Sequence, residues 1–488
     1  MSKQRFSDKQ IFSKERLVEI LESTIDCTLG DLDTKGVFDR AKDKSKITGI
    51  AGMVIEQSIL GYDADTKQEC DILVDGVETE VKSTGIVLDK TVDDGTYAAK
   101  EPMSITAVSP DSIVKETFLE SHFWKKLAHP LFIYYQYTRP GERIGASDYS
   151  EFPIRGYEFH VFTDEERDTL ANDWALVRSH VLTQRSQGVK DITIPREVRK
   201  DLVLIDTAPK YNPRFRLKRT FVDRIVKDHF SKEDVDRHSV PWRFNRYSDL
   251  DRRCHDISRN FSKYTVKALM DWFGITTNPR SKQLGESITL RMLDSDAGKL
   301  NQITLFQEAG LIGKTVKLNT RDRSTEDMKL FRIDFEEFLD PGTCFEDSYI
   351  FDYFSNHQFL CIVFKDEVEG ATPEDQRFLG FKRLSFDDDF IQTEVRRTWE
   401  EIRDLVRTGR LEETILRDKD GGPRRNRKGN YVTSINFPKS KHYPVFVRGD
   451  GADSDDKPET LCGISMYRQW IWIEGDHLVG LLDGLDYL

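Results

Sequence analysis

The sequence predicts a protein of mixed helices and strands, of the α/β or α+β class. Apolar side chains recur at helical spacing in residues 14–32 and again in residues 164–182, where a Thr-x-x-Glu start indicates a capping box. Residues 71–82, DILVDGVETEVK, are two short apolar segments around an Asp-Gly pair, the pattern of a hairpin with a two-residue turn. Residues 131–137 are an apolar run that predicts a further strand. The first half of the chain therefore carries both kinds of element.

Length and composition indicate a globular protein of two or three domains. The chain has 488 residues, of which 38% are hydrophobic and 32% are charged. Its N-terminus is polar and no apolar run reaches transmembrane length, so we expect a cytoplasmic protein without membrane association. The six cysteines are scattered without a C-x-x-C pair, which favours reduced thiols over a disulfide framework or a zinc site.

The predicted hairpin at residues 71–82 brings acidic side chains together. Pairing outward from the Asp-Gly turn sets Asp71 opposite Glu80, and strand alternation adds Glu78 and Lys82 to the same face. Two carboxylates held this close repel each other unless a cation lies between them, and Mg²⁺ prefers carboxylate and carbonyl oxygens. The pattern is typical of a metal-dependent phosphodiesterase. On spacing alone, a solvated hairpin edge remains the favoured alternative.

A glutamate on the preceding helix adds to this pattern. The helix expected at residues 47–60 is apolar around Glu56, and Gly49 and Gly52 lie on the same helical face. Without side chains there, another backbone or a ligand can approach the carboxylate. An ordinary exposed glutamate is the alternative. The order of a helical glutamate, then an aspartate, then Glu-x-Lys favours the functional interpretation.

Basic and aromatic side chains alternate in residues 214–226, RFRLKRTFVDRIV. Its first residues include Arg214, Arg216, Lys218 and Arg219, which suit an element that tracks phosphates and reads bases. A solvated basic strand and helix is an equal alternative. The net charge of −12 argues mildly against nucleic-acid binding, although such footprints are local.

The first half of the chain resembles the MutH family of Mg²⁺-dependent endonucleases. The resemblance rests on collinear motifs within residues 14–230: Thr28-Leu29-Gly30-Asp31-Leu32, the Glu56 helix, Asp71, Glu80-Val81-Lys82, Trp174 in a long helix, and residues 215–221. It implies the restriction-endonuclease core, a mixed sheet flanked by helices. Arg216 stands where the family has a tyrosine that helps to sense adenine methylation, so the resemblance does not extend to methylation sensing.

The resemblance also implies roles for individual residues. Asp71, Glu80 and the Val81 carbonyl would bind Mg²⁺, with Mn²⁺ as a substitute. Glu56 would hold a second metal or orient the first, and Lys82 would position the attacking water and lower its pKa. The products would carry a 5′-phosphate and a 3′-hydroxyl.

A further lysine of the family falls near Lys125 and Lys126. The sequence does not distinguish the two. Both are therefore candidate DNA contacts, together with the four basic residues of the 214–226 segment.

The second half of the chain resembles a degenerate copy of the first. Residues 314–317 are similar to residues 79–82, and residues 399–403 are similar to residues 174–178. Residues 286–293 are similar to the Glu56 helix. Thr289 and Thr315 stand where the first half has glutamates, so no metal site is expected there. We expect a catalytic domain over residues 1–232, a linker over 233–260, and an inactive MutH-like DNA-binding or effector domain over 261–488.

These expectations favour a type II restriction endonuclease that cuts both strands at a short palindrome, with GATC the favoured site. Its partners would be duplex DNA, in one or two copies as substrate and effector, and a cognate DNA methyltransferase. The protein would be a monomer or a DNA-induced dimer. The alternatives are a strand-nicking mismatch-repair nuclease, a non-catalytic DNA-binding or regulatory protein, and a nuclease for RNA or single strands. For the basic segment 417–428, a solvated loop is favoured over a contact to effector DNA.

Overall fold

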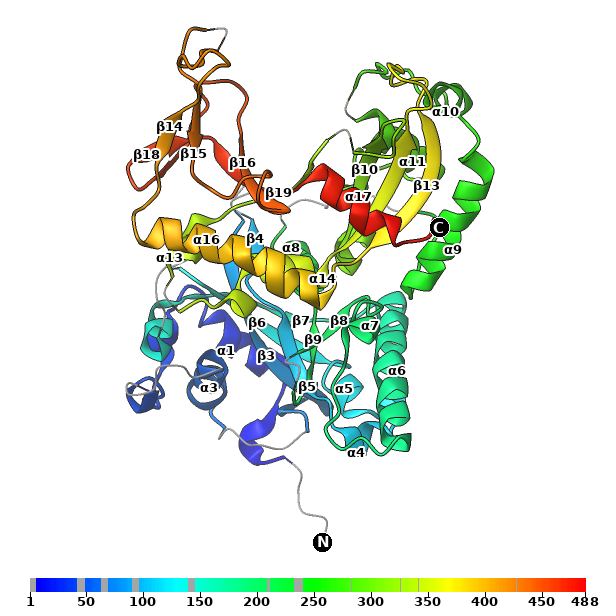
Figure 1. The fold of residues 1–488 in the computed structure, drawn as a ribbon. Helices are drawn as coiled ribbons and strands as arrows, with labels where there is room; N and C mark the ends of the chain where they lie inside the picture. The colour runs from blue at the N-terminus through cyan, green and yellow to red at the C-terminus, as the bar shows by residue number, and fades with distance from the viewer. Residues whose placement is uncertain are drawn as a thin grey trace. The chain divides into compact units, whose positions relative to one another are not determined.

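The computed structural model of the chain divides into two compact units (Figure 1). The described residues are 6–41, 49–62, 69–89, 96–138, 145–208, 211–231, 240–281, 283–324, 326–340, 342–426 and 428–488. The first unit contains the described residues as far as Leu250, together with Ile303–Gly310. The second contains Asp251–Gln302 and Leu311–Leu488.

The main sheet of the first unit is mixed and carries the predicted hairpin. Its strand order is β1-β2-β3-β6-β7, and β4 pairs with the far end of β3. The strands are β1 (Ile11–Phe12), β2 (Ile72–Val74), β3 (Val77–Leu88), β4 (Tyr97–Ala99), β6 (Pro130–Gln136) and β7 (Ile154–Phe159). β3 runs parallel to β6, and β6 runs antiparallel to β7. A second sheet has the order β5-β9-β8, with β5 (Met103–Ala107), β8 (Ile205–Ala208) and β9 (Arg214–Leu217).

The hairpin follows the predicted register. Asp75 and Gly76 both have positive φ, 48° and 83°, as the two central residues of a type I′ turn require. Ile72 then pairs with Thr79, and Val74 pairs with Val77. This confirms the pairing that the Asp-Gly dipeptide predicts, and it fixes which side chains of β3 share a face with Asp71.

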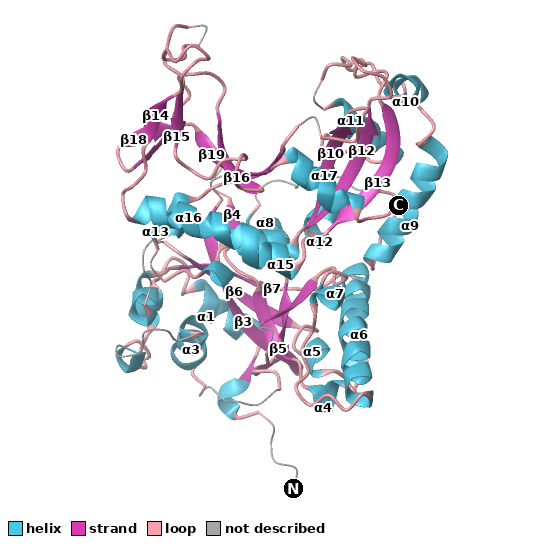
Figure 2. Ribbon diagram, viewed as in Figure 1, coloured by secondary structure: helices cyan, strands magenta, loops and turns pink. Residues whose placement is uncertain are grey.

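Helices flank these sheets, as Figure 2 shows. Those of the first unit are α1 (Lys14–Glu22), α2 (Leu29–Leu32), α3 (Ile50–Val54), α4 (Pro110–Ile113), α5 (His122–Lys125), α6 (Asp164–Ser186), α7 (Arg196–Arg199), α8 (Arg219–Phe230) and α12 (Thr304–Ala309). Leu17 and Val54 belong to one buried cluster with Leu131 and Ile133, so α1 and α3 pack on the same face of the main sheet. The predicted fold class, a mixed sheet flanked by helices, is confirmed.

The long helix α6 begins with the predicted capping box. The Thr163 hydroxyl accepts from the Glu166 N–H at 3.2 Å, and the Glu166 carboxylate accepts from the Thr163 N–H at 2.7 Å. Further along α6, the fully buried Asp173 accepts hydrogen bonds from the backbone N–H groups of residues 203–205 at 2.8–3.1 Å. This carboxylate ties α6 to the start of β8.

The second unit has two sheets and a shared core. Its strands are β10 (Leu311–Leu318), β11 (Met328–Arg332), β12 (Gln358–Lys365), β13 (Arg377–Leu384), β14 (Glu413–Ile415), β15 (Thr433–Ile435), β16 (Val445–Asp450), β17 (Glu459–Leu461), β18 (Ile464–Met466) and β19 (Arg468–Ile473). The sheet orders are β10-β12-β13 and β11-β19-β16, with hairpins β14-β15 and β17-β18. The helices are α10 (Val266–Phe273), α11 (Leu284–Met292), α13 (Phe335–Leu339), α14 (Tyr349–Asn356), α15 (Asp388–Phe390), α16 (Arg396–Arg407) and α17 (Gly475–Asp483).

The two units share a strand plan. β10-β12-β13 repeats the parallel and then antiparallel pairing of β3-β6-β7, and β11-β19-β16 repeats the antiparallel pairing of β5-β9-β8. Gly52 of α3 faces Ser83 of β3, and Gly285 of α11 faces Thr315 of β10. In each case a missing side chain lets a helix approach the first strand of the motif.

The long helices correspond as well. Trp174 of α6 and Trp399 of α16 are both buried, and an arginine one turn later, Arg178 or Arg403, lies over each indole ring. The helix positions agree with the sequence correspondences of residues 286–293 and 399–403, whereas Thr315 faces Gly285 as Ser83 faces Gly52 and therefore does not occupy the position of Glu80. A duplication of one ancestral domain stays a prediction.

The stretch expected as a linker, residues 233–260, includes ordered structure. It contains most of the helix α9 (Tyr247–Phe261), in which Leu250, Cys254 and Ile257 form one buried stripe. That spacing is helical, although the surrounding charges obscure it in the sequence. Among the helices of the described segments, none is long and apolar enough to cross a membrane.

Candidate active site

Asp71 and Glu80 meet at the open end of the β2-β3 hairpin. The Asp71 carboxylate accepts the backbone N–H of Val81 at 2.8 Å, which holds it against β3 next to Glu80. The Asp71 carbonyl in turn accepts the side-chain amide of Gln10 at 2.9 Å. Both the aspartate and the chain leading into β2 are thereby fixed in position. The predicted juxtaposition of Asp71 and Glu80 follows from these contacts and from the hairpin register.

Two lysines hold the Glu80 carboxylate, which is only 1% exposed. Lys82 Nζ lies 2.5 Å from Glu80 Oε1. Lys126 Nζ donates to both carboxylate oxygens at 2.8 Å and to the Glu69 carbonyl at 3.1 Å. The contact between Lys82 and Glu80 places them on one face of β3, as the strand alternation predicts.

The structure distinguishes the two candidate lysines near the end of α5. The Lys126 ammonium enters the cluster around Glu80, whereas Lys125 has an exposed side chain and offers its carbonyl to the Cys70 thiol at 3.3 Å. Burial raises the pKa of Cys70 to about 12, so this thiol stays neutral. Lys126 is therefore the residue positioned to act with Glu80.

The negative charge of Asp71 is balanced less fully by neighbouring lysines than the charge of Glu80. Burial, followed by the negative charge of Glu80, raises the pKa of Asp71 to about 6, and Lys82 offsets only part of this effect. A partly buried carboxylate beside a second carboxylate gains most from a cation that contacts both. The pair is thus electrostatically suited to a cation.

The donor set fits a hard divalent metal. Asp71 and Glu80 supply carboxylate oxygens, and Val81 supplies a backbone carbonyl between them in the chain. Mg²⁺ is usually bound by one or two carboxylates and completes its shell with water. Within the described ranges, no three His, Cys, Asp or Glu side chains come together as a metal site. The site therefore offers two carboxylates and a carbonyl, not a complete cage.

Glu56 lies on the neighbouring helix. Among the described residues, Glu56 does not come together with Asp71 and Glu80 as a three-ligand metal site. Its segment, residues 55–59, is a π-helical turn that continues α3, and the Glu56 carbonyl accepts from the Tyr62 N–H at 3.1 Å. The start of the helix expected at residues 47–60 falls outside the described residues. Because α3 packs on β3, Glu56 is carried on the element next to the site.

The basic segment before α8 is only partly exposed. Arg214 is exposed and donates to Ser104 at 2.8 Å, and Arg216 forms an ion pair with the buried Asp206. Lys218 is buried and donates to the Leu202 carbonyl at 2.5 Å, while Arg219 donates to the Ala99 carbonyl at 2.9 Å. Among these four expected DNA contacts, Arg214 is the exposed one, and Lys218 is held by the protein itself.

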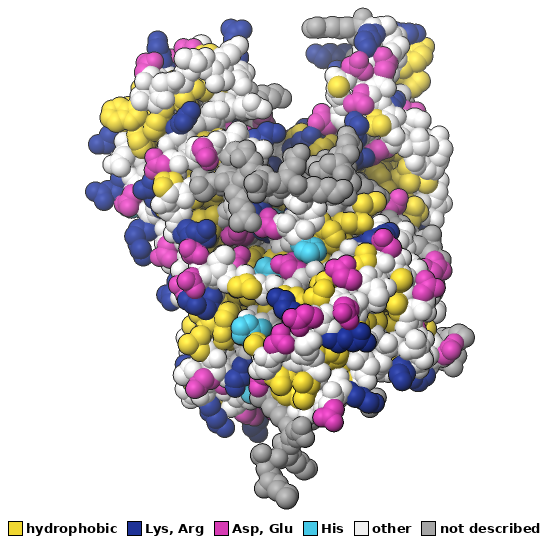
Figure 3. All heavy atoms as spheres, turned by 180° about the vertical axis from the view of Figure 1, so that it is seen from behind, with side chains coloured by type: hydrophobic (Ala, Val, Ile, Leu, Met, Phe, Trp, Pro, Cys, Tyr) yellow, Lys and Arg dark blue, Asp and Glu magenta, His cyan; other side chains and the backbone are white. Residues whose placement is uncertain are grey.

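Basic and acidic side chains are interspersed over the face of the molecule shown in Figure 3. This distribution agrees with the net charge of −12. Any contact to nucleic acid would therefore depend on local groups such as Arg214 and not on one extended basic surface of that face.

Residues 60–173 match the family described as DNA mismatch repair enzyme MutH. The matched segment contains Asp71, Glu80, Lys82 and Lys126, which are the residues brought together at the hairpin. It begins after Glu56 and ends before the basic segment at 214–226. The MutH match supports a nuclease that acts on DNA. No curated protein matches the chain closely enough to count as a relative.

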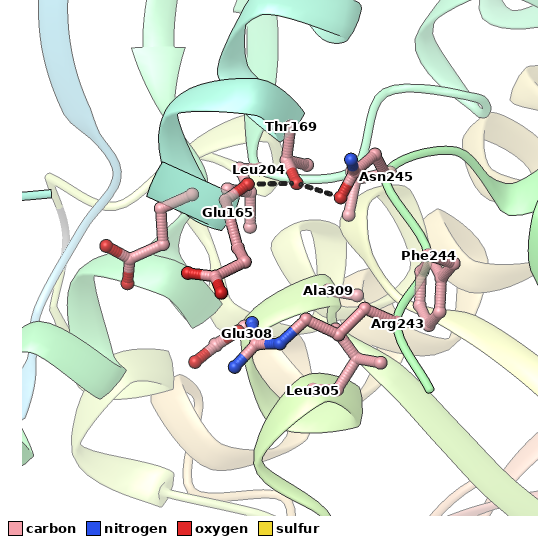
Figure 4. A pocket seen from close by; sticks show the side chains of 11 residues that line it. Glu165, Thr169, Leu204, Arg243, Phe244, Asn245, Leu305, Glu308 and Ala309 are labelled. Atoms are coloured by element: carbon pink, nitrogen blue, oxygen red, sulfur yellow. Dashed lines mark hydrogen bonds between the residues drawn. The ribbon is translucent and has the colours of Figure 1, made fainter. Parts of the chain in front are cut away.

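A second cluster of charges lines a small pocket in the first unit, away from the MutH-like carboxylate pair in sequence (Figure 4). Glu165 and Glu166 come from the start of α6, Arg243 precedes α9, and Glu308 lies on α12. The Tyr247 hydroxyl donates to the Ala309 carbonyl at 2.7 Å and helps to hold α12 in place. Burial, followed by the charge of Glu166, raises the pKa of Glu308 to about 7. No local sequence pattern marks this cluster, because its charged members come from three separate segments of the chain.

Glu308→Gln is expected to stabilise the first unit selectively at high pH. The pKa of this carboxyl rises from 4.5 to about 7 on folding, so its stabilising effect is present below the lower value and is lost as pH rises through the higher one. The free energy of unfolding of the wild type should therefore fall, relative to the variant, by about 2–3 kcal/mol between about pH 5 and about pH 8. Thermal unfolding of both proteins at the two pH values measures this difference.

The exposed Glu400→Gln is the matched control, because it removes a carboxylate from a helix surface. It should shift stability equally at both pH values. A pH-independent difference between the wild type and Glu308→Gln would contradict the assigned burial of Glu308.

Proposed function

We propose that this chain is a type II restriction endonuclease that cleaves both strands of DNA at a short palindrome, with GATC the favoured site. The observation that carries the proposal is the carboxylate pair Asp71 and Glu80, held with Lys82 and Lys126 at the end of the hairpin. The MutH match over the same residues supports a phosphodiester hydrolase acting on DNA.

In this proposal Asp71, Glu80 and the Val81 carbonyl hold Mg²⁺, for which Mn²⁺ can substitute. When bound, the metal would lower the pKa of a water molecule and shield charge on the phosphate. Lys82 lies beside Glu80 and would orient that water through its ammonium hydrogens. Glu56, on the helix packed against β3, would orient the metal-binding residues or hold a second ion.

Lys126 has a different role in this proposal. Its ammonium contacts both oxygens of Glu80 and the Glu69 carbonyl, so it fixes the carboxylate before metal or DNA arrives. Such pre-organisation keeps catalytic groups in place without reorganisation during the reaction. Lys126 is therefore a positioning residue, and Arg214 is the candidate phosphate contact with the most exposed position in its segment.

The second unit is proposed as an inactive relative that binds DNA as an effector. Thr289 stands where the first unit has Glu56, and β10, the counterpart of β3, carries no Asp or Glu, so this unit cannot supply the same ligands. The shared strand plan and the paired tryptophan–arginine contacts support the relationship. A cognate DNA methyltransferase would protect host DNA, and the chain would act as a monomer or a DNA-induced dimer.

A strand-nicking nuclease of the mismatch-repair kind is the second candidate, since the family match takes its description from that enzyme. Supercoiled plasmid and the full chain in Mg²⁺ separate the two. Linear DNA appearing without an added partner protein supports restriction cleavage. Nicked circles alone would replace it with the nicking function.

A further inference from the structure

Residues 413–435 form an exposed ribbon on the second unit, here called the basic arm. β14 and β15 pair antiparallel from Glu413 opposite Ile435 to Ile415 opposite Thr433. Beyond them the chain forms two local turns, closed by isolated bridges between Arg417 and Pro423 and between Arg425 and Tyr431. Residues 417–428, for which the sequence favours a solvated loop, include residues 417–426, which are exposed or half-buried turns held by these bridges. Figure 1 draws it in orange, extending beyond β16 and β18 of the same unit.

The basic arm is firmly anchored but carries no core of its own. At its base, the Asn436 side chain accepts from the Glu412 N–H at 2.9 Å and donates to the Arg410 carbonyl at 2.9 Å. Leu411 and Phe437 are buried on either side of this anchor. All side chains of β14 are exposed, and Ile415 is 50% exposed. The side chains of β15 are half-buried and Ile435 packs against the core of the second unit, so the base of the arm rests on its own unit while its outer part extends into solvent.

The charge of the basic arm is opposite to that of the whole chain. It contains six Lys or Arg and three Asp or Glu, whereas the chain has a net charge of −12. Arg417, Lys419 and Arg424 are exposed and form no ion pair with the residues that the structure describes. Lys428 differs, because it pairs with Asp453 and Asp455 at 3.4 and 3.0 Å. The positive charges of Arg417, Lys419 and Arg424 are therefore not neutralised by an ion pair within the described residues.

An ordered arginine adds a second feature. The Arg425 guanidinium lies over the Tyr431 ring, 4.1 Å from its centroid, and also donates to the Gly429 carbonyl at 2.6 Å. A guanidinium already held by these contacts loses less freedom when it binds, and arginine is the side chain that most often contacts guanine in the major groove.

We infer that the basic arm contacts duplex DNA by entering its major groove. The major groove admits a two-stranded β-ribbon, and surplus positive charge on such a ribbon is matched by the phosphates along its rims. The inference extends the proposed DNA-binding role of the second unit by assigning the element that makes the contact. The partner is double-stranded DNA rather than a protein, because Arg417, Lys419 and Arg424 offer positive charge without an ion-pair partner among the described residues.

The test measures binding of the full chain to a fluorescent duplex of about three helical turns, in EDTA so that no cleavage occurs. The triple variant Arg417→Ala/Lys419→Ala/Arg424→Ala is compared with Lys263→Ala/Lys267→Ala/Lys299→Ala, which removes three exposed lysines from other segments of the second unit. Fluorescence anisotropy over about 50–200 mM salt gives the affinity and its salt dependence. Thermal unfolding confirms that both variants are folded.

The arm variant should bind duplex at least about tenfold more weakly at low salt, and its slope of log K against log salt should fall by about 2–3, at roughly 0.9 for each phosphate contact. The control variant should keep the slope of the wild type. Equal slopes in all three proteins would overturn the inference. An equal loss on single-stranded DNA of the same length would overturn the assignment to the duplex groove.

The outcome is independent of cleavage. If the plasmid assay finds no nuclease activity but the arm variant loses the salt-dependent affinity, the proposed function fails and the DNA contact of the arm stands. If cleavage is found and the arm variant binds as the wild type does, the proposed function stands and the DNA contact of the arm fails.

Discussion

Lys82→Ala is expected to reduce DNA cleavage in Mg²⁺ by about a thousandfold or more while leaving DNA binding within a few-fold of the wild type. Lys82 is the partly exposed lysine of the site, with 20% of its side chain accessible and its ammonium 2.5 Å from Glu80. A group that positions a proton in the transition state contributes about 10²–10⁴-fold to rate. Single-turnover cleavage of plasmid, together with anisotropy in EDTA, separates the rate from the binding.

Lys115→Ala is the matched control, since Lys115 is exposed on the same unit and lies outside the hairpin cluster. It should cleave as the wild type does. Cleavage by Lys82→Ala at a rate close to that of the wild type would remove Lys82 from the catalytic assignment.

Comparison with Lys126→Ala then distinguishes positioning from direct participation. The Lys126 side chain is only 9% exposed and bonds both Glu80 oxygens, so its loss leaves a buried carboxylate with one partner fewer. This variant should lose cleavage and also about 1–3 kcal/mol of stability. Lys82→Ala should lose cleavage with a smaller change in stability.

The second large effect is expected on stability. Asp173→Ala should lower the free energy of unfolding of the first unit by about 3–5 kcal/mol, because the carboxylate is fully buried and accepts three backbone N–H groups at the start of β8. Removing it leaves these donors buried without an acceptor. Chemical unfolding followed by tryptophan fluorescence measures the change.

Asp168→Ala on the same helix is the control for helix propensity and charge, because Asp168 is 59% exposed in its side chain. It should change stability by less than about 0.5 kcal/mol. Equal effects of the two substitutions would show that Asp173 does not hold β8 as the contacts indicate.

The β2-β3 hairpin could be predicted from sequence because its determinants are local. Asp75 and Gly76 dictate a two-residue turn, and that turn fixes the register that sets Asp71 beside Glu80. The capping box of α6 is equally local, since Thr163 and Glu166 bond each other across one helical turn.

Other features depend on tertiary contacts that local patterns do not encode. The choice between Lys125 and Lys126 is decided by where α5 docks on the hairpin, and the burial of Lys218 depends on the distant Leu202 carbonyl. α12 precedes β10 in the chain yet packs in the first unit, through contacts such as Tyr247 with Ala309. The β14-β15 pairing does not follow from local sequence patterns, because these strands lack apolar alternation.

The central claim is that the Asp71–Glu80 site cuts both strands of DNA at a defined sequence. The most direct test incubates the purified chain with unmethylated and adenine-methylated plasmid in Mg²⁺ and sequences the ends. We expect discrete fragments whose 5′-phosphate ends share one short palindrome, with GATC favoured, and no such fragments from Lys82→Ala. Absence of cutting in Mg²⁺ and in Mn²⁺ while DNA remains bound would contradict the central claim and would identify the chain as a DNA-binding protein.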